Sequence, residues 1–192
     1  WTTKPQQARK IRHRILQVLA FAKSHGWRTT PIPGADELRR GLARQPRSQG
    51  LAAVPFAEVP ALFAGELAKA ETSARLALLF TILTAARSGE ARGARWEQID
   101  RAARTWSRPA SLMKSGLPHV VTLNQAAIAV LDRAAALFGE TGLIFPSARE
   151  GKPLSDMSLA KMLRLAGRSE TVHGFRSSFR DWAAEEMPTV PA

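Results

Sequence analysis

The sequence of 192 residues contains no cysteine and no tyrosine. The lack of cysteine excludes a disulfide framework, thiolate zinc sites, iron–sulfur clusters and cysteine nucleophiles. The lack of tyrosine excludes any mechanism in which this chain alone supplies a tyrosyl group. No apolar run reaches the roughly 18 residues of a membrane-spanning helix, and the first residues lack the apolar core of a signal peptide. We therefore expect a cytoplasmic protein that does not contact membranes.

Acidic residues are also scarce. The chain has 16 Asp and Glu against 28 Lys and Arg, a net charge of +12, which is typical of proteins that bind nucleic acids or acidic surfaces. Residues 1–50 carry +9 of this charge. The acidic residues form no cluster suited to a divalent metal, and the four histidines lie far apart in the sequence. A metal-dependent nuclease or phosphatase is therefore disfavoured, and we predict neither a metal nor a cofactor.

Apolar residues near the N-terminus recur at steps of three and four, which predicts a helix with one buried face that ends before Gly26. Four basic residues fall mostly outside this apolar stripe. They form either a solvated basic face or a face that contacts phosphates, and both interpretations stay open. The apolar positions are Ala8, Ile11, Ile15, Val18, Leu19 and Ala22, and the basic ones are Arg9, Lys10, Arg12 and Arg14.

From Thr30 to about Pro55 the composition shifts to Pro, Gly, Arg, Ser and Gln, which predicts a linker between two compact units. The pattern after it favours a mainly α fold with a small antiparallel β-sheet, an α+β class. The almost entirely apolar stretch 73–84 predicts a buried helix. Two helices are predicted at 59–70 and 173–185. Two more begin at N-caps, one from Asn124 to about residue 138 and one from Ser155 to about residue 165. The short segments 98–100, 105–107, 112–114 and 119–123 predict the sheet.

An arginine and a glutamate lie three residues apart just after the buried helix. At the end of a buried helix, Arg87 would extend from a rigid backbone, and Glu90 could hold its guanidinium in position. Planar bidentate donors of this kind suit phosphate oxygens. An ordinary ion pair at a helix end explains the same spacing.

Two further segments carry chemically useful side chains. If this segment is helical, His173 and Arg176 lie one turn apart and point the same way, while Phe175, Phe179 and Trp182 are expected on the opposite, buried side. This pair forms either a shared site or part of an ordinary helix surface. Lys114, at a predicted hairpin tip, could deliver a proton or a positive charge to a ligand, or it is simply solvated.

The order and spacing of these candidate residues resemble the catalytic domain of the tyrosine recombinases, the phage integrase family, and in particular prophage integrases of the P4 type. The residues are Arg87, Glu90, Lys114, His173 and Arg176. The resemblance spans about residues 50–186. It implies that residues 1–41 are the last helices of a core DNA-binding domain, that 42–55 are a linker, and that 56–192 are a catalytic domain. The stretches that carry it are 79–96, 113–119, 151–157 and 172–184.

The resemblance also implies a role for each candidate residue. Arg87 and Arg176 would hold the non-bridging oxygens of the scissile DNA phosphate, and Glu90 would support Arg87. Lys114 would protonate the departing 5′ oxygen, and His173 would hydrogen-bond the phosphate and assist proton transfer. The implied partners are double-stranded DNA at attachment sites, other integrase protomers in a synaptic complex and accessory DNA-bending proteins. The implied location is the bacterial cytoplasm, at the nucleoid.

This chain departs from the family pattern at its most important residue. The family nucleophile is a tyrosine near the C-terminus that follows a second His or Trp, and neither can be assigned here. We therefore expect a truncated catalytic domain of a prophage or genomic-island integrase, which carries the phosphate-binding residues and cannot cleave DNA alone. The alternative is a non-catalytic DNA-binding remnant of a decayed integrase, in which replacing Arg87 or Arg176 would leave DNA binding almost unchanged.

Overall fold

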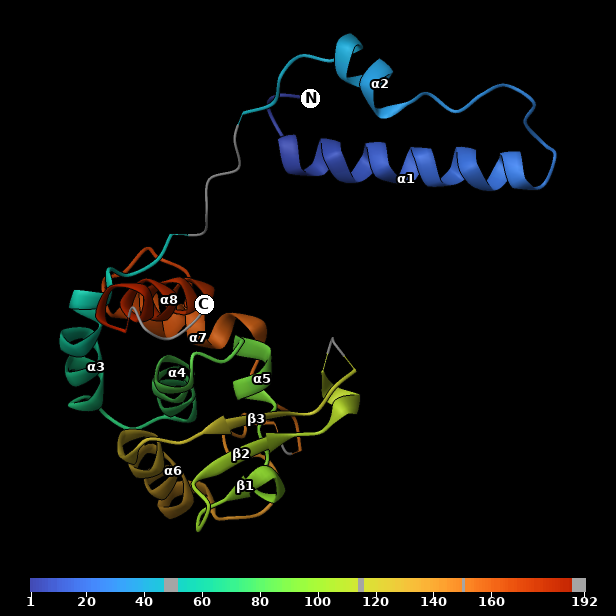
Figure 1. Ribbon diagram of the computed structural model, residues 1–192. Coiled ribbons are helices and arrows are strands. Elements are labelled where there is room, and N and C mark those ends of the chain that lie inside the picture. The colour runs from blue at the N-terminus through green and yellow to red at the C-terminus, as the bar shows by residue number, and fades with distance from the viewer. Residues whose placement is uncertain (47–51, 114–115, 150, 188–192) are drawn as a thin grey trace. The chain divides into compact units, whose positions relative to one another are not determined.

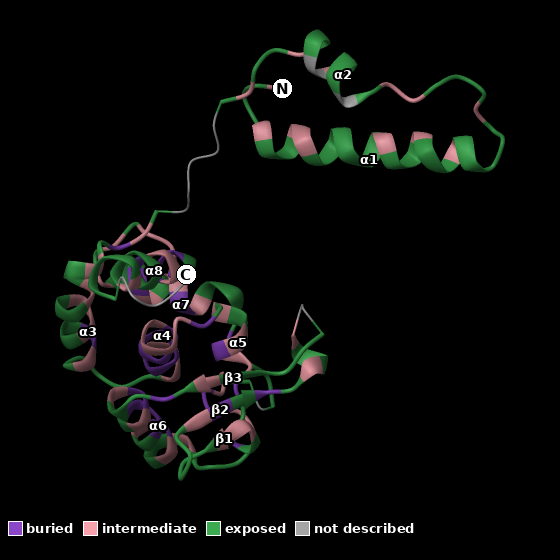
Figure 2. Ribbon diagram, in the orientation of Figure 1, coloured by how far each residue is buried: buried purple, intermediate pink, exposed green. Residues whose placement is uncertain are grey.

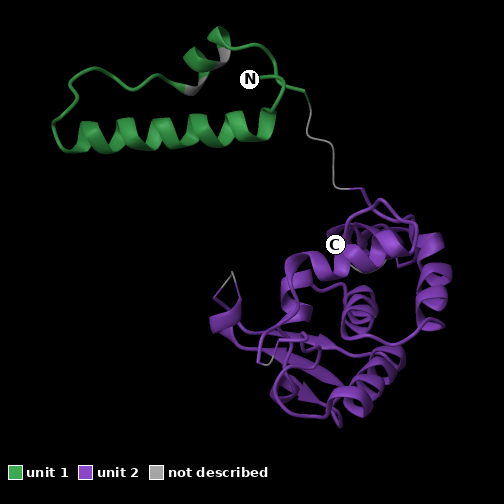
Figure 3. Cartoon of the chain, turned by 180° about the vertical axis from the view of Figure 1, so that it is seen from behind, with its two compact units in different colours: residues 1–50 green, residues 51–192 purple. Residues whose placement is uncertain are grey.

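The computed structural model describes residues 1–46, 52–113, 116–149 and 151–187. The chain divides into two compact units, residues 1–50 and residues 51–192 (Figure 3). Within the described ranges, no helix is long and apolar enough to cross a membrane. The assignment of the first unit to a core DNA-binding domain stays a prediction.

The first unit contains two helices, α1 (Pro5–Ser24) and α2 (Ala35–Gly41). Helix α1 ends before Gly26, whose φ of 72° is readily adopted only by glycine. Helix α2 lies inside the stretch from Thr30 that composition predicted to be a linker, so that prediction is wrong for residues 35–41. The segment after α2 returns to the start of α1, where the Trp1 indole donates a hydrogen bond to the carbonyl of Ala43 (2.7 Å).

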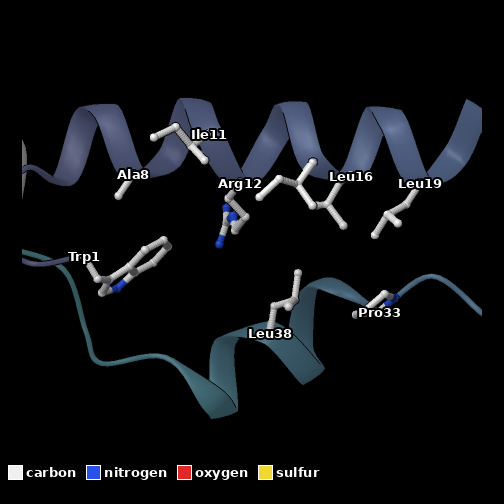
Figure 4. Close-up of a pocket in the computed structure, with 9 residues that line it drawn as sticks. Trp1, Ala8, Ile11, Arg12, Leu16, Leu19, Pro33 and Leu38 are labelled. Atoms are coloured by element: carbon white, nitrogen blue, oxygen red, sulfur yellow. The ribbon is translucent and has the colours of Figure 1, made fainter.

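The apolar stripe of α1 is not buried, contrary to our prediction. Ile11, Ile15 and Val18 each expose more than half of their surface. Figure 4 shows Trp1, Pro33 and Leu38 opposite this helix, and with it they line an open apolar groove of about 410 Å³. A unit of about 50 residues with one returning segment does not supply enough apolar surface to cover a 20-residue helix.

The second unit combines helices with a three-stranded antiparallel sheet of order β1-β2-β3 (Figure 1). The predicted strand at 112–114 is wrong, because residues 110–112 form a single 3₁₀ turn, η3, and Lys114 lies outside the described residues. The elements are η1 (Phe56–Glu58), α3 (Val59–Leu67), α4 (Ser73–Thr84), α5 (Ser88–Arg92), η2 (Trp96–Gln98), β1 (Ile99–Asp100), β2 (Thr105–Arg108), η3 (Ala110–Leu112), β3 (His119–Thr122), α6 (Gln125–Phe138), α7 (Asp156–Leu165), η4 (Val172–Gly174) and α8 (Phe175–Glu186).

Helix α4 forms the centre of the second unit and packs against α6 and α7. Its residues 76–81 are all buried, and part of α4 has the purple colour of buried residues in Figure 2. The Phe80 ring lies 5.2 Å from that of Trp106 on β2 and 5.5 Å from that of Phe145, so this helix joins the sheet to the helical layer. Asn124 caps α6 as predicted, whereas Ser155 precedes α7 but its hydroxyl bonds Ser158 instead of a backbone amide.

The aromatic residues of α8 are less buried than predicted. Phe175 is buried, but Phe179 and Trp182 are 52% and 38% exposed and contact each other with ring centroids 5.6 Å apart. The buried side of α8 is set by the segment 52–54, because the Ser178 hydroxyl donates a hydrogen bond to the carbonyl of Val54. Phe179 and Trp182 are therefore only partly covered within the described part of the structure.

Candidate active site

The turn between α4 and α5 presents the first candidate residue. Ala85, the C-cap residue that follows α4, has a left-handed backbone with φ of 48°, and Arg87 is the N-cap residue of α5. A non-glycine residue in this region costs energy and persists only where the surroundings impose it. Because α4 is buried, the turn is held rigidly, while the Arg87 side chain is 52% exposed. The turn therefore offers a guanidinium to solvent from a fixed backbone.

Glu90 holds Arg87 through two hydrogen bonds. The backbone N–H of Arg87 donates to Oε2 of Glu90 (3.0 Å), and NH1 of the Arg87 guanidinium donates to Oε1 (2.8 Å). Burial by itself raises the pKa of the Glu90 carboxyl, but the hydrogen bonds from Arg87 and the charge of Arg108 outweigh it, so this pKa is lowered. Glu90 is therefore an ionised carboxylate at neutral pH, which fixes one side of the Arg87 guanidinium.

Arg176 reaches the same turn from the other end of the chain. Its NH1 donates a hydrogen bond to the carbonyl of Ala85, two residues before Arg87. His173 lies in η4, one turn before Arg176, and its side chain is exposed. The structure therefore brings Arg176 to the Arg87 turn, although the two arginines are 89 positions apart in the sequence.

Gly174 lets η4 and α8 approach residues 52–53 closely enough to place this pair. A Cβ atom at Gly174 would lie 2.4 Å from the carbonyl oxygen of Ala52 and 2.7 Å from the Cα of Ala53. Both atoms belong to the backbone and cannot move aside like the end of a flexible side chain. Thr171 supports the same turn, since its hydroxyl accepts a hydrogen bond from the Gly174 amide (3.0 Å).

The other predicted residues are distributed as follows. Lys114 lies outside the described residues. In the first unit, Arg9 donates to the side chain of Gln45, and Arg12 lies 5.7 Å from the ring centroid of Trp1, at the groove. Lys10 and Arg14 are exposed. The predicted basic face is thus divided, because Arg9 and Arg12 also make contacts inside the unit.

Sequence reasoning missed Arg108, a charged residue of β2 that is only 5% exposed. Its NH1 forms an ion pair with Oε2 of Glu90, and its guanidinium lies 4.7 Å from the ring centroid of Trp106. The signal was the strand alternation, because a residue two positions after a buried Trp106 points to the same side of the sheet. The Glu90 carboxylate therefore lies between two arginines.

The arrangement is suited to an anionic oxygen ligand. Arg87 presents an exposed guanidinium, Arg176 donates from the neighbouring helix, and the His173 imidazole lies one turn away on the same segment. Within the described ranges, no group of three or more acidic or histidine side chains could hold a metal ion. The positive charge at this turn is supplied by guanidinium side chains, whose planar donors are suited to oxyanions.

A model of the phage integrase family matches residues 54–189. The chain belongs to the phage integrase family. The matched range includes each candidate residue of the second unit. This match, together with the prophage integrases among the relatives below, confirms the sequence resemblance to tyrosine recombinases.

Prophage integrases of Escherichia coli K12 are among the relatives, and the chain spans about half of their length or less. Prophage integrase IntZ is 33% identical over 98% of this chain and 50% of its own length. Prophage integrase IntA is 29% identical over 90% of this chain and 42% of its own length. The integrase of Enterobacteria phage P4 is 25% identical over 90% of this chain and 43% of its own length.

Solved integrase structures share the fold. A lambda integrase dimer bound to a core site superposes with a TM-score of 0.70 at 20% identity, covering 96% of this chain and 66% of that one. The Tn1549 transposon integrase, in complex with circular intermediate DNA, gives 0.67 at 12% identity, covering 93% and 66%. The predicted fold class, mainly α with a small antiparallel sheet, is therefore confirmed.

Proposed function

We propose that this chain supplies the phosphate-binding part of a site-specific DNA recombinase that integrates a prophage or genomic island. The observation that carries the proposal is the convergence of two arginines at one turn: Arg176 bonds the carbonyl of Ala85, and Arg87 follows two residues later. Two fixed guanidiniums beside a histidine suit the non-bridging oxygens of one DNA phosphate. The family match supports the assignment of this phosphate as the scissile one.

Each residue has a distinct part in the phosphoryl transfer. Glu90 occupies one NH1 donor of Arg87, so the remaining guanidinium donors point away from the carboxylate and are offered to phosphate oxygens. Arg87 and Arg176 stabilise the negative charge on these oxygens in the transition state, where positioning and electrostatics supply most of the catalysis. His173 hydrogen-bonds the phosphate and assists proton transfer. Lys114 gives its proton to the departing 5′ oxygen.

The proposed partners are double-stranded DNA at attachment sites and further integrase protomers. The solved lambda integrase relatives are a dimer bound to a core site and a tetramer bound to a Holliday junction, which supports both partners. The exposed Lys10 and Arg14 of α1, with Arg9 and Arg12, would contact the DNA backbone from the first unit. Accessory DNA-bending proteins and a location at the bacterial nucleoid complete the proposal.

The proposal includes a restriction on what this chain does alone. The sequence has no tyrosine, so it cannot attack the phosphate through a tyrosyl oxygen. Incubated with nicked duplex DNA, it is expected to give no covalent 3′-phosphoprotein adduct on a denaturing gel. A DNA-linked band that survives denaturant and disappears on protease treatment would contradict this restriction.

Measured affinity for duplex DNA tests the phosphate-binding role. Arg87→Ala and Arg176→Ala are each expected to weaken binding about tenfold, because hydrogen bonds to charged groups contribute roughly 1.5–3 kcal/mol. Arg180→Ala is the matched control, since Arg180 lies on the same helix as Arg176 and is 75% exposed. It should weaken binding less than about threefold, as expected for a screened surface charge.

The same measurement separates the recombinase from a non-catalytic remnant. A remnant would bind DNA mainly through its basic first unit, and its affinity would fall with salt according to the number of phosphates neutralised. All three variants would then show the same small loss. That result would overturn the proposed site.

A further inference from the structure

Arg108 is a buried charge that depends on one carboxylate. It is 5% exposed, and within the described ranges neither its Nε nor its NH1 has a hydrogen-bond partner. Its NH1 forms an ion pair with Oε2 of Glu90, and the ring of Trp106 lies against its guanidinium. A buried guanidinium is costly unless it is paired, so the position of Arg108 is fixed by Glu90 and Trp106.

The same carboxylate fixes Arg87. Oε2 of Glu90 receives both the backbone N–H of Arg87 and the ion pair with Arg108, and this leaves Oε1 directed at NH1 of Arg87. Glu90 lies on the single-turn helix α5, and its side chain is 15% exposed. The buried charge of Arg108, together with the Arg87 backbone N–H, holds one carboxylate oxygen and so sets the orientation of the other.

The ion pair also joins two segments of the proposed site. Arg108 is the last residue of β2 and lies opposite His119, the first residue of β3, so this pair forms the base of the β2–β3 hairpin. Lys114 lies between the two residues in the sequence. Glu90 belongs to α5, which begins directly after Arg87. The contact therefore connects the hairpin base to the turn that presents Arg87.

We propose that Arg108 is a positioning residue, which holds the Glu90 carboxylate and through it orients the Arg87 guanidinium for a DNA phosphate. The inference rests on the proposed role of Arg87 in phosphate binding. Arg108 itself is too buried to contact DNA, so its effect on DNA affinity must pass through Arg87. This requirement makes the proposal testable by the coupling between the two residues.

The variants isolate the charge of Arg108. Arg108→Met keeps an unbranched apolar stem against Trp106 and removes the charge, whereas Arg108→Lys keeps the charge. Arg92→Met is the matched control on α5. Arg92 is also mostly buried, forms an ion pair with Asp156 and donates a hydrogen bond to the carbonyl of Leu154. If Arg108→Met does not fold, Arg108→Gln takes its place and is judged by the same results.

The first measurement follows the Arg87 side chain by NMR without DNA. Its Nε–Hε signal is assigned by its absence in Arg87→Ala. In Arg108→Met, ¹⁵N relaxation should show faster motion of this group, and Arg108→Lys should restore most of the order. Arg92→Met should leave the signal as in the wild type. An unchanged Arg87 signal in Arg108→Met would overturn the proposal.

The second measurement is a double-mutant cycle on the affinity for duplex DNA. Arg108→Met is expected to weaken binding roughly three- to tenfold in the wild-type background, a coupling typical of residues that share a partner, and to have almost no effect in the Arg87→Ala background. Equal losses in both backgrounds would overturn the proposal. If Arg87→Ala itself has no effect on affinity, the proposed function fails, and the NMR result alone decides whether Arg108 orders Arg87.

Discussion

Replacing Glu90 by glutamine tests how much the ion pairs of Glu90 with Arg87 and Arg108 stabilise the candidate site. The carboxylate is 15% exposed and lies between the buried Arg108 and the exposed Arg87. Removing one partner of a buried ion pair costs about 3–5 kcal/mol because the other charge stays buried and unpaired. Glutamine still accepts hydrogen bonds and the Glu90 side chain is partly exposed, so we expect a smaller loss of about 2–3 kcal/mol. In a domain of this size, that loss lowers Tm by roughly 5–10 °C.

The effect of Glu90→Gln should depend on pH with a definite sign. The folded-state pKa of Glu90 is lowered, so the carboxylate stabilises the fold fully above the unfolded-state pKa of about 4.3. This contribution disappears as the pH falls through the lowered folded-state pKa. The difference in unfolding free energy between wild type and variant should therefore be constant near neutral pH and shrink in acid.

Urea unfolding followed by tryptophan fluorescence measures this difference at several pH values. Glu97→Gln is the matched control, because Glu97 pairs with Arg95 at an exposed position (3.3 Å), and it should unfold at nearly the wild-type urea concentration. The reasoning is refuted if Glu90→Gln is no more destabilising than Glu97→Gln. It is also refuted if the loss stays constant down to the acid limit.

The remaining predictions concern the backbone, the chemistry and the oriented arginine. Gly174→Ala should destabilise the second unit by about 1–3 kcal/mol in the same urea unfolding assay, because its Cβ would collide with the backbone of Ala52. The control is Gly65→Ala inside α3, where no atom lies within 4 Å of the added Cβ. This variant should be neutral or stabilising. The chain alone should form no covalent adduct with nicked DNA on a denaturing gel. Arg108→Met should weaken DNA binding only while Arg87 is present.

Much of the second unit could be predicted from the sequence, because its signals are local. The predicted bounds of the buried helix, 73–84, agree with α4. This helix is an uninterrupted apolar run, and its N-cap Thr72 bonds the nearby Arg75 amide, so the pattern involves only residues close together in the sequence. The Asn124 cap and the three strands are local in the same sense. The prediction of a strand at 112–114 is wrong because a short apolar stretch does not distinguish a strand from a 3₁₀ turn.

The errors arise where burial depends on distant segments. The stripe of α1 has the right period, yet periodicity does not show whether a partner surface exists to cover it. Phe179 and Trp182 lie outside the stripe of α8 that the segment 52–54 covers. Arg108 was missed because its partner Glu90 lies on another element. The convergence of Arg176 on the turn before Arg87 could be expected only from the family resemblance.

The central claim is that Arg87 and Arg176 bind the same DNA phosphate, and the salt dependence of duplex affinity tests it most directly. Each phosphate that a protein neutralises contributes about 0.9 to the slope of log affinity against log salt concentration. If one phosphate is shared, the double variant Arg87→Ala/Arg176→Ala should reduce the slope by about 0.9, with losses of affinity that are less than additive. A reduction of about 1.8 with additive losses would show two separate phosphates and contradict the account.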